Sequence, residues 1–196
     1  MVGNSTGVGS GAALPSASVA RRIAEHYPCA NIVNRAREGA MTKVVAAQIA
    51  GTGDTHFDLA LVQTGAIDVL RFTAPGDLRR AIIMALNHAR ARADHVVFLM
   101  PGNVGLAPIF VPPFGWIYTR RALQDRHIFI RAAQAAGVEY VDLFNGPANN
   151  AFARDPWQYY ASDGLHPSEH SYAAWYRALI NKTHVKAILE CSADRH

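Results

Sequence analysis

The chain has 196 residues, of which 50% are hydrophobic and 17% charged, a composition that suits a folded domain with a large buried core and excludes an intrinsically disordered chain. The net charge is only +4, and the basic residues are scattered among Ala and Leu without interleaved aromatic residues, so we expect no nucleic-acid partner. The two cysteines, Cys29 and Cys191, are too few for a disulfide framework or a four-cysteine zinc site, although a single disulfide stays open.

Short apolar, β-branched runs alternate with amphipathic stretches along the whole chain. After a strand stub at Met1-Val2, strands are predicted at Asn31–Arg35, Phe57–Gln63, His95–Met100 and Val138–Phe144. Helices are predicted at Ala17–Tyr27, Met41–Ala50, Asp77–Ala93, Thr119–Ala136 and Ser168–Leu189, the last interrupted near Asn181–Thr183. Such alternation predicts a parallel sheet covered on both faces. We therefore expect one α/β domain over residues 1–196, a three-layer α/β/α sandwich with a flavodoxin-like, five-stranded sheet of order 2-1-3-4-5.

The first turn, Gly3-Asn4-Ser5-Thr6-Gly7, places a serine between the strand stub and a following helix. A sharp turn of this kind exposes the hydroxyl at the sheet edge, where backbone N–H groups can face a developing oxyanion. The spacing differs from the G-x-S-x-G elbow, so an α/β-hydrolase of that type is not indicated. Without further support, the stretch also reads as a structural turn.

The overlapping stretch Gly7-Val8-Gly9-Ser10-Gly11-Ala12 matches the dinucleotide fingerprint G-x-G-x-x-G/A. That fingerprint needs an acidic residue at the end of strand two to hold a ribose. Here the strand ends in Val33-Asn34-Arg35, and Glu38 lies beyond it in the turn. We therefore expect no nucleotide cofactor.

Near the other end, Asp163 stands three residues before His166 on a Gly-containing loop. The spacing lets the carboxylate accept a hydrogen bond from Nδ1 of the histidine and leaves Nε2 to take a proton from a serine. A plain helix start with Pro167 at the first position is the structural alternative. The same segment fits the zinc pattern H-x-x-E-H through His170, but a residue before proline is pushed out of the helical conformation, and no third ligand is marked. We expect no metal.

Four blocks would meet at the carboxyl edge of the predicted sheet: Ser5, Gly39, the run Gly65-Ala66-Ile67-Asp68, and Asp163 with His166. In order, spacing and position the chain resembles the SGNH hydrolase superfamily, or GDSL-type esterases and lipases, over essentially its whole length. That family reads Gly-Asp-Ser, Gly, Gly-x-Asn-Asp and Asp-x-x-His in its four blocks. The resemblance implies that Ser5 is the nucleophile, His166 the base and Asp163 its orienting partner.

The resemblance also implies an oxyanion hole from the backbone N–H groups of Ser5 and Gly39, but two residues depart from the family pattern. Asn4 replaces the family's Asp, and Ile67 replaces its oxyanion Asn with a side chain that cannot donate. Losing one such donor typically costs about 10²–10³ in rate. Asn103 or Asn145 are the next candidate donors.

Together these observations predict a carboxylic-ester hydrolase that cleaves small ester or thioester substrates by Ser-His-Asp acyl transfer. The alternative is a catalytically impaired relative that binds acylated ligands without efficient turnover, which Ile67 favours and the intact Ser5, Asp163 and His166 oppose. Aromatic residues on two segments are predicted to form an acyl or aryl pocket, although they would equally serve to cover the core: Phe110, Phe114, Trp116, Trp157 and Tyr160.

The apolar stretches are broken by Pro or charge well before the ~20 residues that a membrane span requires. No signal segment opens the chain, so the sequence as given predicts a cytoplasmic protein without a membrane span. Because Met1-Val2 stands where a full strand should lie, a longer natural N-terminus would leave room for an export signal.

Overall fold

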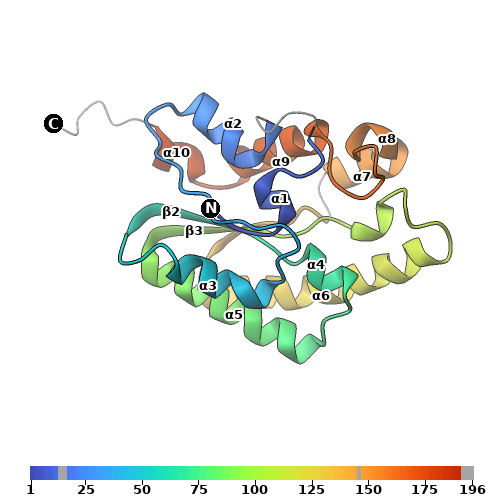
Figure 1. Cartoon of the computed structure of the whole chain (residues 1–196), viewed down its shortest axis with the longest axis horizontal. Helices are drawn as coiled ribbons and strands as arrows, with labels where there is room; N and C mark the ends of the chain where they lie inside the picture. The colour runs from blue at the N-terminus through green and yellow to red at the C-terminus, as the bar shows by residue number, and fades with distance from the viewer. Residues whose placement is uncertain (13–16, 145–146, 191–196) are drawn as a thin grey trace.

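The computed structural model describes residues 1–12, 17–144 and 147–190, with the side chains of residues 147–150 left out; Asn145 and Cys191 lie outside these ranges. The strands are β1 (Val2–Gly3), β2 (Phe57–Gln63), β3 (Ala93–Leu99) and β4 (Glu139–Val141). The helices, shown in Figure 1, are α1 (Ser5–Val8), α2 (Val19–His26), α3 (Val45–Ala50), α4 (Ala66–Leu70), α5 (Pro75–Arg92), α6 (Phe114–Ala136), α7 (Pro147–Arg154), α8 (Pro156–Tyr159), α9 (Glu169–Lys182) and α10 (Val185–Leu189). Two 3-10 turns, η2 (Thr42–Val44) and η3 (Val104–Leu106), complete the described elements.

The four strands form one parallel sheet in the order β1-β2-β3-β4, which confirms the predicted parallel α/β architecture. In this register Val62 of β2 pairs with Val2 on one side and with Phe98 on the other. Parallel strands end together at one edge, so the turns after β1, β2 and β3 meet there.

The described structure forms no strand at Asn31–Arg35, where one was predicted, so the expectation of five strands is wrong. This segment still runs beside β1 in a parallel pattern, because Met1 N donates to Val33 O at 2.6 Å and Arg35 N to Met1 O at 2.8 Å. The ladder is interrupted at the N–H of Gly3, which donates instead to Oε1 of Gln48 at 2.7 Å, although Gly3 O still accepts from Arg37 N at 3.0 Å. A side chain thus takes the place of the next backbone partner.

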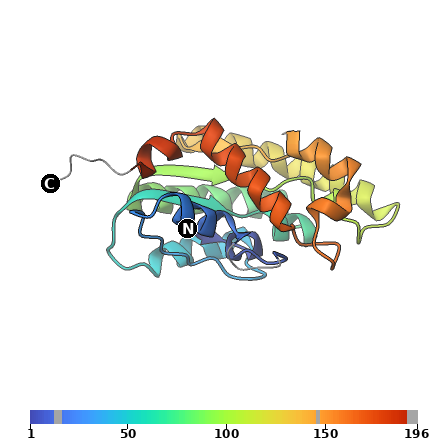
Figure 2. The same ribbon diagram turned by 90° about the horizontal axis from the view of Figure 1, so that it is seen from above.

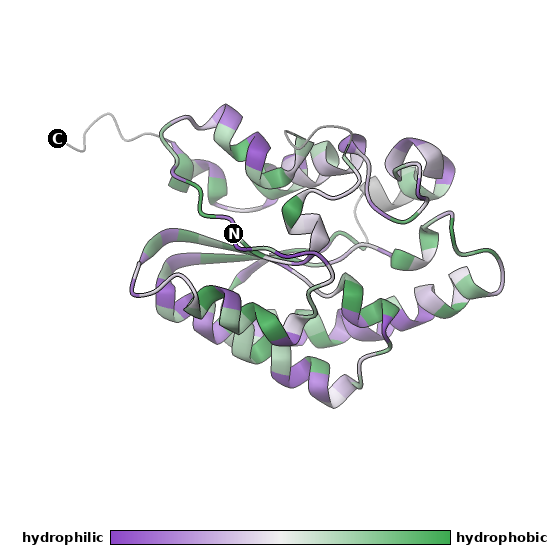
Figure 3. Ribbon diagram, viewed as in Figure 1, coloured by the Kyte–Doolittle hydropathy of each residue, from purple (hydrophilic) through white to green (hydrophobic). Residues whose placement is uncertain are grey.

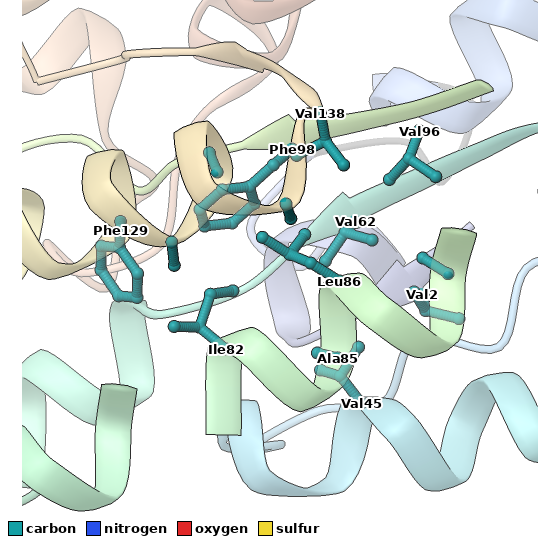
Figure 4. Packing of buried hydrophobic residues seen from close by; sticks show 14 of the residues in the cluster. Val2, Val45, Val62, Ile82, Ala85, Leu86, Val96, Phe98, Phe129 and Val138 are labelled. Atoms are coloured by element: carbon teal, nitrogen blue, oxygen red, sulfur yellow. The ribbon is translucent and has the colours of Figure 1, made fainter. Parts of the chain in front are cut away.

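Helices cover both faces of the sheet, as predicted (Figures 1 and 2). Because alternate residues of a strand point to opposite faces, Val62 and Phe98 pack against α3, α5 and α6. Their neighbours Leu61 and Val97 pack against α2 and α9. The first of these two cores holds Phe98 and Phe129 edge to face, with ring centroids 5.6 Å apart, and is shown in Figure 4.

Helix boundaries follow the apolar periodicity closely, with two exceptions: α3 begins at Val45 and not at Met41, after the 3-10 turn Thr42–Val44, and α6 begins early. The predicted break near Asn181–Thr183 is confirmed, because α9 ends at Lys182 and α10 begins at Val185. Helix α6 starts at Phe114 instead of Thr119, so several exposed apolar residues belong to its first turns.

The longer helices carry polar and apolar residues side by side (Figure 3). Within the described ranges, none is both long and apolar enough to cross a membrane.

Candidate active site

Ser5 is the first residue of α1 and directly follows the end of β1. The turn is tight, since a Cβ on Gly3, at φ +145°, would lie 1.9 Å from the carbonyl oxygen of Gln63. Asn4 caps the helix: its Oδ1 accepts from Thr6 N at 3.1 Å and from the Thr6 hydroxyl at 2.6 Å. Asn4 therefore supplies the capping acceptor without a charge, and the turn fixes Ser5 at the carboxyl edge of the sheet.

Asp163 and His166 lie on a loop whose two ends are joined by an isolated antiparallel β-bridge between Tyr160 and Pro167. Asp163 Oδ2 is 2.6 Å from His166 Nδ1, and Asp163 Oδ1 accepts from the backbone N–H groups of Leu165 and His166, each at 2.9 Å. Burial acts to raise the pKa of Asp163, but these three hydrogen bonds, with the charge of His166, hold it below its ordinary value. At neutral pH an ionised Asp163 therefore orients the imidazole.

One pocket of about 100 Å³ is lined by both Ser5 and His166. Asp163 lies behind the histidine and is not a lining residue. Within the described part of the chain, no hydrogen bond joins Ser5 to His166; in enzymes without bound substrate, catalytic contacts are often long and tighten in the complex. The structure thus brings the serine and the histidine–aspartate pair to one site from opposite ends of the sequence.

The rest of the pocket wall is largely apolar, with three side-chain amides among it. The apolar lining includes Ile67, Leu70, Leu99, Met100, Val104, Leu143, Phe152, Leu165 and Trp175, and the amides are Asn4, Gln63 and Asn103. Nδ2 of Asn4 and Oε1 of Gln63 are buried without a hydrogen-bond partner. Such a wall suits an apolar acyl group flanked by a few oriented polar atoms.

In the segment after β2, two residues hold the turn and one faces the pocket. A Cβ on Gly65, at φ +110°, would lie 2.5 Å from the ring of Phe129, so this turn requires glycine. The carboxylate of Asp68 is buried and accepts from Thr42 N at 2.9 Å, which fixes the turn. Between these two anchors, Ile67 lines the pocket as an aliphatic group.

Asn103 is the candidate donor that the structure places in this pocket, since Asn145 lies outside the described residues. Asn103 is buried in the loop that follows β3, directly before η3, and its Oδ1 accepts from Gly105 N at 3.0 Å. This bond leaves Nδ2 as the amide atom available for donation, and no hydrogen bond within the described residues engages it.

Gly39 lies in an exposed left-handed turn and is not a pocket-lining residue. Its loop nevertheless reaches the turn that follows α1, because the Ser10 hydroxyl donates to Glu38 at 2.6 Å. Whether the N–H of Gly39 serves the oxyanion stays a prediction.

Of the five aromatic residues predicted to line the pocket, the structure brings Tyr160 there. The others, Phe110, Phe114, Trp116 and Trp157, are not lining residues, and the last three are more than half exposed. Burial raises the pKa of Tyr160, whose hydroxyl donates to the carbonyl of Asn103 at 3.5 Å. Two further aromatic residues, Phe152 and Trp175, line the pocket without being marked by any sequence motif, and their rings stack with centroids 6.4 Å apart.

Other possible sites are less suited to chemistry. A hollow of about 490 Å³ near Met1, Val33 and Phe57 includes none of the candidate catalytic residues. His166 precedes α9, which carries His170, so the two histidines do not share a helix. Across the described ranges, no group of three or more His, Cys, Asp or Glu side chains is arranged to hold a metal ion.

Comparison with known proteins gives one family and one fold. The model of the GDSL-like Lipase/Acylhydrolase family matches residues 1–174. Among solved structures, one described as TesA has a TM-score of 0.72 and 18% identity, with 95% of this chain and 97% of that chain covered. A member of the lipolytic G-D-S-L family from Veillonella parvula has a TM-score of 0.69 and 14% identity, covering 92% of this chain and 94% of its own.

Axe2, an acetylxylan esterase from Geobacillus stearothermophilus, has a TM-score of 0.64 and 16% identity, with 92% and 91% of the two chains covered. No curated protein sequence matches the chain.

Proposed function

The chain belongs to the GDSL-like lipase/acylhydrolase family, the SGNH hydrolases, and on this premise we propose that it is a serine ester hydrolase with Ser5 as nucleophile, His166 as general base and Asp163 as the residue that orients the base. The observation that carries the proposal is the 2.6 Å contact between Asp163 and His166 beside a pocket that His166 shares with Ser5. A histidine held by an ionised carboxylate at Nδ1 has Nε2 available to accept a proton.

In the proposed reaction, Ser5 Oγ attacks the ester carbonyl while its proton passes to Nε2 of His166. The C–O bond to the alcohol then breaks, and His166 returns the proton to the leaving oxygen. Water attacks the acyl-serine, again giving a proton to His166, and the acid leaves as Ser5 is reprotonated. Asp163 stabilises the imidazolium in both halves of the cycle without itself becoming protonated.

The oxyanion of each tetrahedral intermediate needs donors that Ile67 cannot supply. We assign this role to the backbone N–H groups of Ser5 and Gly39 and to Nδ2 of Asn103. Asn103 lines the pocket, and the hydrogen bond to Gly105 N sets the orientation of its amide. A preorganised side-chain donor of this kind contributes about 10²–10³ in rate.

The size of the pocket limits the acyl group. At about 100 Å³ it is well below the roughly 300–1,000 Å³ of sites that hold drug-sized ligands, so we propose an acyl chain of about two to four carbons on an ester or thioester. The ester hydrolysed by Axe2, named in its description as acetylxylan, is an example of a short acyl group on a large alcohol.

The competing function is a binding protein for acylated ligands that turns them over poorly, and Ile67 is the residue that favours it. A panel of p-nitrophenyl esters from acetate to decanoate distinguishes the two. The proposal predicts turnover that is highest for the shortest chains and absent in Ser5→Ala. Binding of the esters without turnover in the wild-type protein would favour the competing function.

A further inference from the structure

An exposed apolar surface lies beside the pocket and is formed mainly by the segment that leads from β3 into α6. We call it the apolar patch and define it as Phe72, Ile109, Val111, Phe114, Trp116 and Ile117, all of them large apolar residues with substantial exposure. The most exposed, Trp116 and Val111, present 73% and 62% of their surface to solvent. Large exposed apolar patches mark protein–protein or membrane interaction sites or ligand-binding grooves.

Tyr118 links Phe72 by ring contacts to Phe110, which lies between the patch residues Ile109 and Val111 in the chain. Its ring centroid lies 4.3 Å from that of Phe110 and 5.4 Å from that of Phe72. Phe72 is also the one non-glycine residue with positive φ, at 51°, in the described part of the chain. A bulky residue is held in this costly conformation only where the surroundings fix it, so the backbone that carries the Phe72 ring has a defined position.

The patch is tied to the catalytic loop and to the pocket wall. Ile109 N donates to the carbonyl of Gly164, between Asp163 and His166, at 3.1 Å. At the other end of the segment, Asn103 and Val104 line the pocket, and Gly105 packs against Gly115 and Thr119 of α6. In Figure 1 the segment is the yellow-green loop that projects at the end of the molecule. Whatever docks on the patch therefore lies next to the site at which Ser5 would react.

The exposed carboxylate of Asp163 lies on the adjoining catalytic loop, but the segment that carries most of the patch is basic, which favours an anionic occupant. Residues 101–124 contain two arginines and no acidic residue. Arg121 is bound to Asp125 at 2.9 Å, but Arg120 is exposed on α6, the helix that carries Trp116, and exposed Arg71 directly precedes Phe72 in the chain. A two-fold contact with a second copy would bring these arginines together, whereas an anionic surface would neutralise them.

We propose that the apolar patch docks the protein on an anionic lipid surface, with Trp116 and its apolar neighbours in the interfacial layer and Arg71 and Arg120 against the headgroups. Tryptophan is suited to this layer because its ring is apolar and its N–H is polar. Docking would hold the pocket close to the lipid surface, where amphiphilic esters collect. Docking of this kind does not require catalysis, since only exposed residues outside the pocket make the contact.

Sedimentation with vesicles tests the proposal. The probes are vesicles of phosphatidylcholine alone and of phosphatidylcholine mixed with phosphatidylglycerol. The wild-type protein should bind the anionic vesicles, with weaker binding at high salt. Val111→Asp and Trp116→Ala should each lower binding at least about ten-fold, and Arg120→Gln about five-fold. Met84→Ala, which removes an exposed side chain from α5, serves as the matched control and should leave binding unchanged.

Two further measurements separate this proposal from the proposed function. Ser5→Ala should bind vesicles as the wild type does, and Val111→Asp should hydrolyse p-nitrophenyl acetate at the wild-type rate. The proposal is overturned if the wild-type protein binds neither kind of vesicle, or if Val111→Asp binds the anionic vesicles as well as the wild type does. It is equally overturned if ultracentrifugation shows a dimer that Val111→Asp dissociates, because a second copy would then cover the patch.

Discussion

Asp163 and His166 face each other within one loop, with Asp163 Oδ2 2.6 Å from His166 Nδ1, while the other carboxylate oxygen accepts two backbone N–H groups. The carboxylate thus both shapes the loop and orients the imidazole. The two functions can be separated experimentally, because Asn retains an oxygen acceptor and loses the charge.

Asp163→Asn is expected to keep the loop and lose most of the activity. Its Oδ1 can still accept from Leu165 N, whereas the imidazolium formed in the reaction loses its counter-charge. For a triad aspartate this change costs up to about 10⁴ in kcat. Steady-state kinetics on p-nitrophenyl acetate and thermal melting at pH 7 test the two expectations together. An activity within a few-fold of wild type would show that Asp163 has no part in catalysis.

The same substitution has a pH-dependent effect on stability. Because the pKa of Asp163 is lower in the folded protein than in the unfolded chain, its carboxylate stabilises the fold at neutral pH and loses this contribution as the pH falls through the acid range. The difference in Tm between wild type and Asp163→Asn should therefore be present at pH 7 and shrink below about pH 4. A difference that grows on acidification would contradict the assigned charge state.

Ile67 and Asn103 are expected to be coupled through the oxyanion. Ile67→Asn should raise kcat, by up to ~10²-fold, with less change in KM, because the added bond strengthens only as charge develops. Asn103→Asp keeps the acceptor that Gly105 N requires but removes the donor, so it should lower kcat strongly. In the double variant the loss caused by Asn103→Asp should be smaller, since the amide introduced by Ile67→Asn then supplies a donor.

Equal effects of Asn103→Asp in both backgrounds would show that the two positions act independently. Should a well-folded Ile67→Asn protein be no faster, the oxyanion is bound elsewhere or ester hydrolysis is not the chemistry. Melting curves of each variant provide the control for folding.

Asp125 is expected to make the fold less stable as the pH rises. Burial raises its pKa, the hydrogen bond and charge of Arg121 offset part of this, and Oδ1 has no hydrogen-bond partner. A carboxyl group whose pKa is raised by folding binds its proton more tightly in the folded state than in the unfolded chain, so its ionisation at higher pH disfavours the folded state. The free energy of unfolding therefore falls as the pH rises from about 4 through the raised value.

Asp125→Asn should remove this pH dependence, because the amide stays neutral and can still accept from Arg121. Chemical denaturation between pH 4 and 8 measures the slope. Asp77→Asn, which neutralises an exposed carboxylate paired with Arg80, is the matched control and should leave the slope unchanged. A wild-type slope that persists in Asp125→Asn would assign the effect to another group.

The regular elements were predictable because their apolar periodicity is strong. Strand β2 was predicted at its observed bounds, and the break between α9 and α10 at its observed place. The segment at Asn31–Arg35 has the same apolar character, but the bond from Gly3 N to Gln48 interrupts its ladder. That long-range contact leaves no local signal in the sequence.

The candidate site was predictable where it depends on short loops and less so where it depends on packing. Asp163 and His166 are three residues apart, so their contact follows from local geometry. Phe152 and Trp175 come from two different helices and meet only in the folded chain. Phe114 and Trp116 are large aromatic residues in the segment after a strand, which favours a pocket. They lie instead in the first turn of α6, where both are exposed to solvent.

The central claim is that Ser5 is the nucleophile, and labelling with a fluorophosphonate followed by peptide mapping tests it most directly. The account predicts one adduct on Ser5, abolished by Ser5→Ala, greatly slowed in His166→Ala, and retained in Ser10→Ala, the neighbouring serine whose hydroxyl is bound to Glu38. An adduct on another residue, or ester hydrolysis by a protein that takes up no label, would contradict the account.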